Sequence, residues 1–194
     1  MNELIKEIEK KAAKLKNAVD KAKSIALFSH RSPDADTIGA VTAFYFFLTK
    51  LKKKVLLYCD DFIPEHLKFI HGSDKYNIND YKCDLAISLD CASAEMLRGL
   101  KNKYLSYAST INIDHHQDNK EYAKINIVSN NVSSCCELSF IIAKALDWEI
   151  DTATAENLYA GIVDDTGSFA HSNVKANTFE VCAELLKLGV DSNK

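Results

Sequence analysis

The sequence has little glycine and proline, no long apolar run, and no excess of basic residues. Six glycines and two prolines among 194 residues are too few for an all-β chain built from many tight turns. A membrane-spanning helix needs about 18 or more consecutive apolar residues, and none occurs, so we expect no membrane span. The formal net charge of −3 lacks the basic excess typical of proteins that grip many nucleic-acid phosphates. This charge does not exclude a small phosphate-bearing substrate held through metal ions, because bound metal ions add positive charge that a count of residues omits.

The six cysteines lack the spacing of a zinc site. No two form a C-x-x-C pair, and the adjacent Cys135 and Cys136 are not spaced as zinc ligands. The first sixteen residues contain three glutamates and no continuous apolar stretch, so they resemble neither a signal peptide nor a transit peptide. We therefore expect a cytoplasmic protein whose reduced thiols mostly fill the core.

The residues that are present predict one α/β domain. A composition of 47% hydrophobic and 26% charged residues is typical of a globular protein, and the length corresponds to one domain. We expect an amphipathic helix within residues 1–23 and a single domain over residues 24–190. Short apolar runs predict buried parallel strands at 24–30, 55–60, 85–90 and 110–114, with an added or edge strand at 125–129. Helices are expected at 36–51, 94–100, 134–146, 153–163 and 178–188. This alternation predicts a mostly parallel sheet flanked by helices.

Chemically active residues follow the predicted strands. His30 ends the first strand, Asp60 and Asp61 follow the second, and Asp90 and Asp114 end the third and fourth. Ligands of open α/β sheets bind outside the carboxyl ends of the strands, so several of these side chains are expected to meet at one edge. A cluster of carboxylates repels itself unless cations compensate it. Histidine and aspartate together suit Mn²⁺, Mg²⁺, Fe²⁺ or Zn²⁺.

Two segments near the first and third strands carry part of this chemistry. The first, His30-Arg-Ser-Pro-Asp34-Ala-Asp36-Thr-Ile-Gly39, places one imidazole and two carboxylates on a strand-to-helix loop. In an extended loop Asp34 and Asp36 point to opposite sides, so each could serve a different metal. Either aspartate alone is equally typical of a helix N-cap. The second is Asp90 in Ser-Leu-Asp-Cys, which taken alone is typical of a turn. A further candidate cap is Ser134, which with Glu137 predicts a capping box.

Two later segments complete the set. Asp114-His115-His116 ends the fourth strand, where adjacent histidines cannot face the same way. One can therefore bind metal while the other faces substrate, and Asp114 can orient an imidazole from behind. The last segment, Gly161-Ile-Val-Asp164-Asp165-Thr166-Gly167, places an acidic pair before a glycine turn. Taken alone, that pair also fits a solvated turn.

In this order the four segments resemble the motifs of the DHH phosphoesterase superfamily. They match H-x-x-P-D-x-D-x-x-G, a strand-end aspartate, D-H-H and G-I-x-x-D-T-G. Phe169-Ala-His171-Ser-Asn173 and the helix that ends at Gly189 are similar to the RecJ-like branch. Within that branch the chain resembles the N-terminal catalytic domain of the nano-RNase/pAp-phosphatase (bifunctional oligoribonuclease) type. The resemblance covers about residues 24–190.

The resemblance implies a Rossmann-like DHH domain with two divalent metal ions, expected to be Mn²⁺ with Mg²⁺ as the alternative. By motif position the metal ligands are His30, Asp34, Asp36, Asp90, His115 and Asp165, with Asp90 bridging both ions. Asp90 and His116 are the implied catalytic residues, and His116 lies near the scissile phosphate as a charge stabiliser or proton donor. Asp114 is expected to orient an imidazole of the site without binding metal itself, and His171 to line the pocket. Asp164 lies beside a ligand but is not expected to be one. His66 and His71 fall outside the motifs and are expected at the surface.

The implied activity is hydrolysis of phosphate ester bonds by a water that the two metals activate. The expected substrates are short oligoribonucleotides, pAp or cyclic dinucleotides. The alternatives are a manganese-dependent inorganic pyrophosphatase, which shares the four motifs, and a non-catalytic DHH scaffold domain. Members of the superfamily usually continue into a DHHA1 domain with a G-G-G-H segment, and this chain ends at Lys194 without one. We therefore expect the catalytic part of a longer enzyme, with a nucleotide or short nucleic acid as its partner and a homodimer left open.

Overall fold

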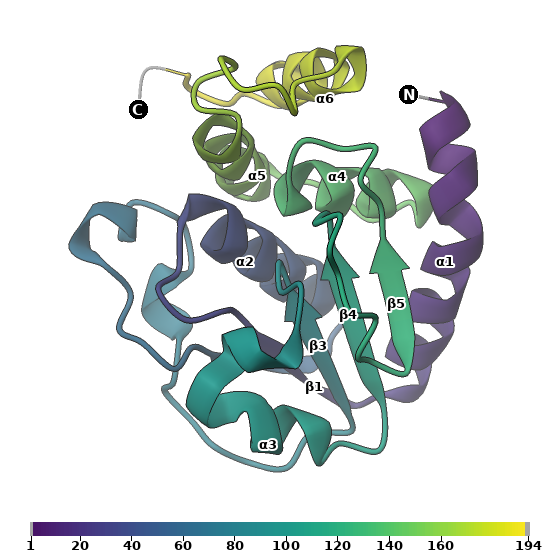
Figure 1. Ribbon diagram of the computed structural model, residues 1–194, viewed down its shortest axis with the longest axis vertical. Coiled ribbons are helices and arrows are strands. Elements are labelled where there is room, and N and C mark those ends of the chain that lie inside the picture. Colours follow the sequence, from purple (N-terminus) through teal and green to yellow (C-terminus); the bar gives the residue numbers. More distant parts are fainter. Residues whose placement is uncertain (1, 193–194) are drawn as a thin grey trace.

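Figure 1 shows the protein as a computed structural model that describes residues 2–192, with side chains from residue 5 onward; Lys194 lies outside the described residues. The strands are β1 (Ser24–Phe28), β2 (Lys54–Tyr58), β3 (Leu85–Leu89), β4 (Thr110–Asp114) and β5 (Ile125–Val128). The helices are α1 (Asn2–Lys21), α2 (Ala35–Lys50), α3 (Lys101–Leu105), α4 (Cys135–Ala145), α5 (Thr152–Asp165) and α6 (Ala176–Lys187). Three 3₁₀ segments join them: η1 (Glu65–Leu67), η2 (Ser73–Lys75) and η3 (Ala94–Leu100).

The five strands form one parallel sheet in the order β2-β1-β3-β4-β5. The predicted α/β fold and parallel sheet are confirmed, and β5 is an edge strand. The chain runs from β1 to β2 on one side and then returns to place β3 on the other side of β1. This reversal creates a topological switch point between the carboxyl ends of β1 and β3, the usual ligand site of an open parallel sheet.

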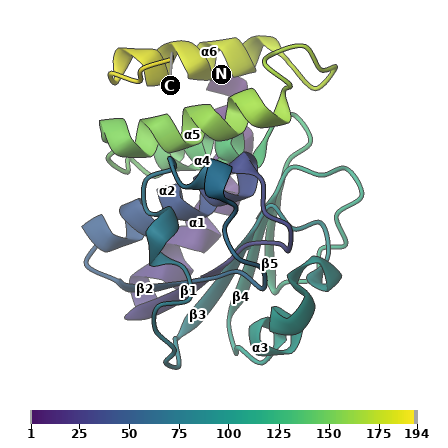
Figure 2. The same cartoon turned by 90° about the vertical axis from the view of Figure 1, so that its left-hand side faces the viewer.

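Helices cover the two faces of the sheet unequally. On one face α1, α2 and α4 pack against the strands, α5 lies over α2 and α4, and α6 is outermost (Figures 1 and 2). On the other face η3 and α3 bury a smaller apolar cluster that includes Phe28, Leu97 and Tyr104. The central strands β1 and β3 are accordingly buried along almost their whole length, as expected when both faces of the sheet are covered. No helix among residues 2–192 has the length and apolar character needed to cross a membrane.

Two local predictions differ from the structure. The expected helix at 94–100 is a 3₁₀ segment with a kink at Arg98 (φ 45°, ψ −117°), and regular α-helix follows only in α3. At the start of α4, Ser134 caps the helix by accepting a hydrogen bond from the backbone N–H of Glu137, as expected. The other hydrogen bond of the predicted capping box, from the N–H of Ser134 to the Glu137 carboxylate, does not form, so this part of the prediction is wrong. The carboxylate accepts from the N–H of Ser133 instead, because the Ser133 and Thr178 hydroxyls also donate to it there.

Candidate metal centre

His30, Asp34 and Asp90 form one group of potential metal ligands at the switch point. His30 Nε2 lies 3.7 Å from Asp34 Oδ2 and 3.3 Å from Asp90 Oδ2. The other ring nitrogen, Nδ1, lies 2.6 Å from the carbonyl oxygen of Arg31. A proton on Nδ1 that donates to this carbonyl leaves the Nε2 lone pair facing the two carboxylates, as a metal-binding histidine requires. Asp34 also accepts from the N–H of Thr37, so it is both the N-cap of α2 and a potential ligand.

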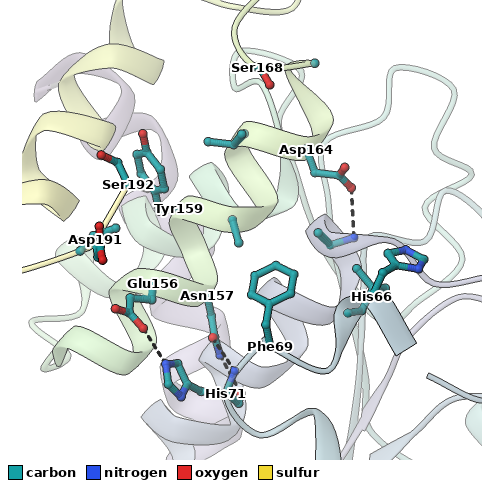
Figure 3. Close-up of a pocket in the computed structure, with 16 residues that line it drawn as sticks. His66, Phe69, His71, Glu156, Asn157, Tyr159, Asp164, Ser168, Asp191 and Ser192 are labelled. Carbon is teal, nitrogen blue, oxygen red and sulfur yellow. Dashed lines mark hydrogen bonds and ion pairs between the residues drawn. The ribbon is translucent and has the colours of Figure 1, made fainter. Parts of the chain in front are cut away.

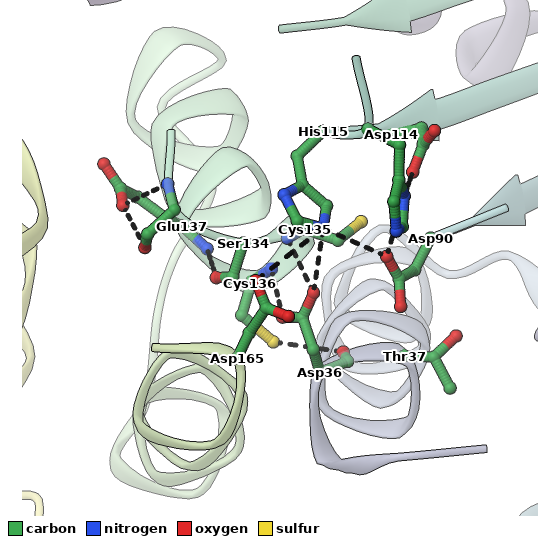
Figure 4. Close-up of polar contacts among 12 residues, drawn as sticks. Asp36, Thr37, Asp90, Asp114, His115, Ser134, Cys135, Cys136, Glu137 and Asp165 are labelled. Atoms are coloured by element: carbon green, nitrogen blue, oxygen red, sulfur yellow. Dashed lines mark hydrogen bonds and ion pairs between the residues drawn. The ribbon is translucent and has the colours of Figure 1, made fainter. Parts of the chain in front are cut away.

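Asp36, His115 and Asp165 form a second group beside the first. His115 Nε2 lies 4.0 Å from Asp36 Oδ2 and 3.8 Å from Asp165 Oδ2. Asp36 is buried, and its carboxylate accepts from the backbone N–H groups of Cys135 at 2.7 Å and Cys136 at 2.9 Å (Figure 4). These N–H groups are the first of α4, where the helix dipole also stabilises a negative charge. The start of α4 therefore fixes both oxygens of Asp36 toward the group.

Asp90 belongs to the first group and also approaches the second. Its Oδ2 faces His30, and its Oδ1 lies 3.5 Å from His115 Nε2. Asp90 has φ of 58°, a conformation that is uncommon for residues other than glycine and often marks functional sites. Oδ1 is buried and has no hydrogen-bond partner. An unpaired buried carboxylate oxygen between two imidazoles fits a divalent cation, which would supply the missing positive partner.

Burial and neighbouring charges shift the pKa values of the potential ligands in both groups. Burial disfavours the charged form of His30, but contacts with Asp34 and Asp90 outweigh burial and raise the pKa of His30 to about 11. The same balance holds for His115. Burial disfavours its protonated form, but Asp90 and other carboxylates outweigh burial and raise the pKa of His115 to about 9. Burial and the nearby Asp90 raise the pKa of Asp36 above its ordinary range. The carboxylates of both groups thus favour positive charge close to them, which divalent cations would supply.

His116 lies half-buried at the edge of this centre, where it forms a third group of potential metal ligands with Asp90 and His115. Its Nδ1 lies 2.7 Å from Asp114 Oδ1, and the side chain is 38% exposed. Asp114 is fully buried, and its other oxygen accepts from the side-chain amide of Asn119 at 2.6 Å. The hydrogen bond to Asp114 raises the pKa of His116 above its ordinary value. With Nδ1 committed to Asp114, the Nε2 atom on the far side of the ring is free to contact a ligand.

The acidic pair Asp164 and Asp165, at the C-terminal end of α5, has two different roles. Asp164 is exposed, and its Oδ2 accepts from the N–H of Ala35 at the start of α2, away from both groups. Asp165 faces His115, and Asn173 Nδ2 donates to the carbonyl and Oδ2 of Asp165. His171 is exposed, and its ring Nδ1 lies 3.2 Å from the carbonyl of Asp165.

Replacing either aspartate of the pair with asparagine separates these roles. We expect Asp164→Asn to weaken only a helix cap, at about 0.5–1 kcal/mol of stability, and to leave Mn²⁺ binding unchanged. Asp165→Asn is expected to weaken Mn²⁺ binding. Isothermal titration calorimetry with Mn²⁺ measures both. Equal loss of Mn²⁺ in the two variants would contradict this assignment.

The other acidic residues at strand ends do not join the centre. Asp60 Oδ2 accepts from the N–H of Gly99, and Asp61 Oδ2 accepts from the N–H of Ser32 at 2.7 Å. Neither belongs to a group of potential metal ligands among the described residues. They join the loops after β1 and β2 to η3, and so support the His30 side of the centre.

Close packing of α5 against α2 and α4 determines where Asp36 lies. A Cβ atom on Gly161 would overlap Cys136 Sγ and lie 2.9 Å from Asp36 Cα. We therefore expect Gly161→Ala to destabilise the protein by about 1–3 kcal/mol, lowering Tm by about 2–4 °C per kcal/mol. Thermal denaturation monitored by circular dichroism measures this, with Gly99→Ala as a control near an exposed carboxylate. An unchanged Tm for Gly161→Ala would contradict the packing described here.

A cavity of about 790 Å³ lies beside the centre, along α5 (Figure 3). Its lining includes Phe69 and Tyr159, and the His71–Glu156 ion pair lies near one end. His66 and His71, expected at the surface, are exposed there. None of the six predicted metal ligands lines this cavity. The candidate chemistry therefore lies at the sheet edge next to the cavity, with Asp164 at the boundary.

The sequence did not reveal the residues that hold the ligands in place. These are the N–H groups of Cys135 and Cys136, the side chain of Asn119, and the link from Glu137 through Ser133 to Asn173. One local signal was present: a serine three residues before a glutamate predicts a helix start, and helix starts bind anions. No local sequence pattern indicates that the start of α4 binds the carboxylate of Asp36, about 100 residues earlier in the chain.

The fold and this centre define a class: a parallel α/β domain with two adjoining carboxylate–imidazole groups at its switch point. Comparison with known proteins identifies the family. A family model described as the DHH family, N-terminal domain, matches residues 24–162, well over half of the chain. The chain belongs to the DHH family. The predicted resemblance to this superfamily is confirmed.

Several relatives share most of the chain. The bifunctional oligoribonuclease and PAP phosphatase NrnA of Bacillus subtilis is 28% identical over 174 residues, which is 88% of this chain and 55% of that protein. The protein of the same name from Thermus thermophilus is 28% identical over 171 residues, 86% of this chain and 50% of its own. An exopolyphosphatase-related protein from Bacteroides fragilis has a solved structure with a TM-score of 0.89 and 26% identity, covering 94% of this chain and 58% of that one. The chain thus spans about half the length of the curated relatives it matches.

Proposed function

We propose that this chain is the catalytic domain of a metal-dependent phosphoesterase that acts on short oligoribonucleotides, pAp or cyclic dinucleotides. The observation that carries the proposal is the position of Asp90 between two ligand groups, with one buried oxygen unpaired. The relatives named as oligoribonuclease and PAP phosphatase support the substrate class.

The six residues of the two groups divide between two divalent ions. His30, Asp34 and Asp90 would hold one, and Asp36, Asp90, His115 and Asp165 the other, with Mn²⁺ expected and Mg²⁺ as the alternative. Once bound, such a pair supplies Lewis acidity at phosphoryl oxygens and lowers the pKa of a water molecule. The protein contributes fixed ligands: Arg31 orients the His30 ring, and the start of α4 holds Asp36.

His116 would act on the leaving group. Its Nδ1–H donates to buried Asp114, which holds the ring and favours its protonated form. Its Nε2–H is then available to stabilise charge on the departing oxygen or to donate a proton to it. General acids placed in this way contribute about 10²–10⁴-fold to rate.

Substrate selection is proposed to involve more than this chain. Because the relatives are about twice as long, we propose residues 24–190 as the catalytic domain of a protein that continues into a DHHA1 domain. A cytoplasmic location and a homodimer stay predictions.

A second candidate is an inorganic pyrophosphatase. A putative family II inorganic pyrophosphatase from Methanococcus jannaschii has a TM-score of 0.65 but only 19% identity, a likeness of fold alone. The scaffold alternative is disfavoured because such domains typically lose ligand positions, and this chain has all six.

Hydrolysis assays with Mn²⁺ separate these candidates. We expect pAp or a dinucleotide to be cleaved, with Asp90→Asn inactive as the control. Cleavage of pyrophosphate alone would favour the pyrophosphatase. Absence of metal binding, with Asp90→Ala changing nothing, would favour the scaffold.

A further inference from the structure

Glu137 is a buried carboxylate that belongs to neither ligand group. It is 0% exposed, and no ion pair involves it in the described part of the chain. Its Oε2 accepts three hydrogen bonds: from Ser133 N at 2.9 Å, Ser133 Oγ at 2.6 Å and Thr178 Oγ1 at 2.9 Å. Its Oε1 is buried without a hydrogen-bond partner. Burying a carboxylate is unfavourable unless its contacts compensate, and here the contacts concentrate on Ser133.

The segment that Glu137 holds leads directly to Asp36. Ser133 is followed by Ser134, which caps α4 through the N–H of Glu137, and then by Cys135 and Cys136. The N–H groups of these two cysteines are the donors to Asp36 (Figure 4). Fixing Ser133 from within the first turn of α4 therefore fixes the direction of both N–H groups.

The same segment also leads to Asp165. The carbonyl of Ser133 accepts from Asn173 Nδ2 at 2.9 Å. That nitrogen also lies 3.1 Å from the carbonyl and 3.2 Å from Oδ2 of Asp165. Oδ2 is the atom that faces His115. Asn173 Oδ1 is buried without a hydrogen-bond partner, so the amide is oriented by the bonds of its nitrogen alone.

We propose that Glu137 is a positioning residue that acts through Ser133 to hold Asp36 and Asp165 as ligands of the same metal ion. It contacts neither that ion nor substrate. The role rests on the proposed metal-dependent function and concerns only the Asp36–His115–Asp165 group, because no described contact joins Glu137 or Ser133 to His30 or Asp34. Residues that orient metal ligands typically change metal affinity by about 10–100-fold when removed.

Calorimetric titration with Mn²⁺ in two backgrounds tests the role. Asp34→Asn is intended to leave only the group with Asp36, and Asp165→Asn only the group with His30. We expect Glu137→Met to weaken Mn²⁺ binding by about 10-fold or more in the first background and to leave the second unchanged. Glu137→Gln should restore most of the affinity, since its amide oxygen can accept the same donors.

A double-mutant cycle tests whether the effect passes through Ser133 and Asn173. In the Asp34→Asn background, Asn173→Ala should weaken Mn²⁺ binding about as much as Glu137→Met does. The double variant should lose less affinity than the product of the two single fold-losses. Ser133→Ala, which removes only the 2.6 Å hydroxyl contact, provides a milder variant if Glu137→Met does not fold. Asp151→Ala is the matched control, because Asp151 is a carboxylate cap at the far end of α5. It should lower Tm without changing Mn²⁺ affinity.

Three results would overturn the role: equal weakening in both backgrounds, no weakening in either, or multiplicative effects in the cycle. Failure of the proposed function looks different, because the unsubstituted protein would then bind no Mn²⁺, or would bind it without cleaving any phosphate ester.

Discussion

Replacing Asp90 with asparagine is expected to abolish binding of both divalent ions and to lower kcat/KM by about 10³-fold or more. Asp90 is the residue whose two oxygens face the two groups, one toward His30 and one toward His115. Burial by itself would raise the pKa of Asp90, but the two imidazoles outweigh burial and lower it. The carboxylate is thus charged and available, whereas an asparagine amide is neutral and a poor bridge between cations.

We expect the Asp90→Asn protein to keep its fold, for a reason that lies in the backbone. Asp90 has φ of 58°, and asparagine tolerates this left-handed conformation better than most residues. Asp84→Asn is the matched control, because Asp84 lies at the opposite end of the same strand and accepts from the N–H groups of Lys23 and Ser24. Calorimetry and steady-state kinetics measure both variants. Two ions bound by Asp90→Asn would exclude Asp90 as the shared ligand.

Replacing His116 with asparagine is expected to lower kcat by about 10²–10⁴-fold while both ions stay bound. His116 forms a further group of potential ligands with Asp90 and His115, but its Nδ1, the nitrogen that faces Asp90, lies closer to Asp114 Oδ1, at 2.7 Å. We therefore expect this nitrogen to bind Asp114 and not a metal ion. The loss should therefore fall on the departure of the leaving group and not on metal affinity. Asp114→Asn should give a smaller loss in kcat, because the ring remains but loses its negative partner.

Leaving groups of different pKa reveal which role His116 has. If it donates a proton, a substrate with a nitrophenolate leaving group should lose much less rate in the His116→Asn variant than a natural nucleotide ester. An equal loss for both substrates would assign His116 to charge stabilisation alone. Loss of one bound ion would show instead that His116 is a metal ligand.

The sequence predicted the order of the elements and the convergence of the ligands for the same reason. Apolar runs marked the strands, and each strand of a parallel sheet delivers its carboxyl end to one edge, so residues such as His30 and Asp90 had to meet. The family motifs then named six residues, which the structure brings together in two groups. Asp60 and Asp61 follow a strand equally closely, yet they bind backbone amides, and only the motifs distinguished them.

What the sequence could not predict depends on contacts between distant segments. Asp36 accepts from an N–H group 100 residues later, and Asn173 joins Asp165 to Ser133 across 40 residues. Such pairs depend on how α2, α4 and α5 pack, which no local pattern encodes. The Glu137 carboxylate shows the limit clearly, because a capping box is a local rule and the tertiary donor Thr178 helps to draw this side chain away from it.

Crystals grown with Mn²⁺, with anomalous diffraction recorded at the manganese edge, test the two-ion centre most directly. We predict two anomalous peaks per chain, one contacted by His30, Asp34 and Asp90 and the other by Asp36, Asp90, His115 and Asp165. A single peak, or peaks that do not share Asp90, would contradict the proposed centre.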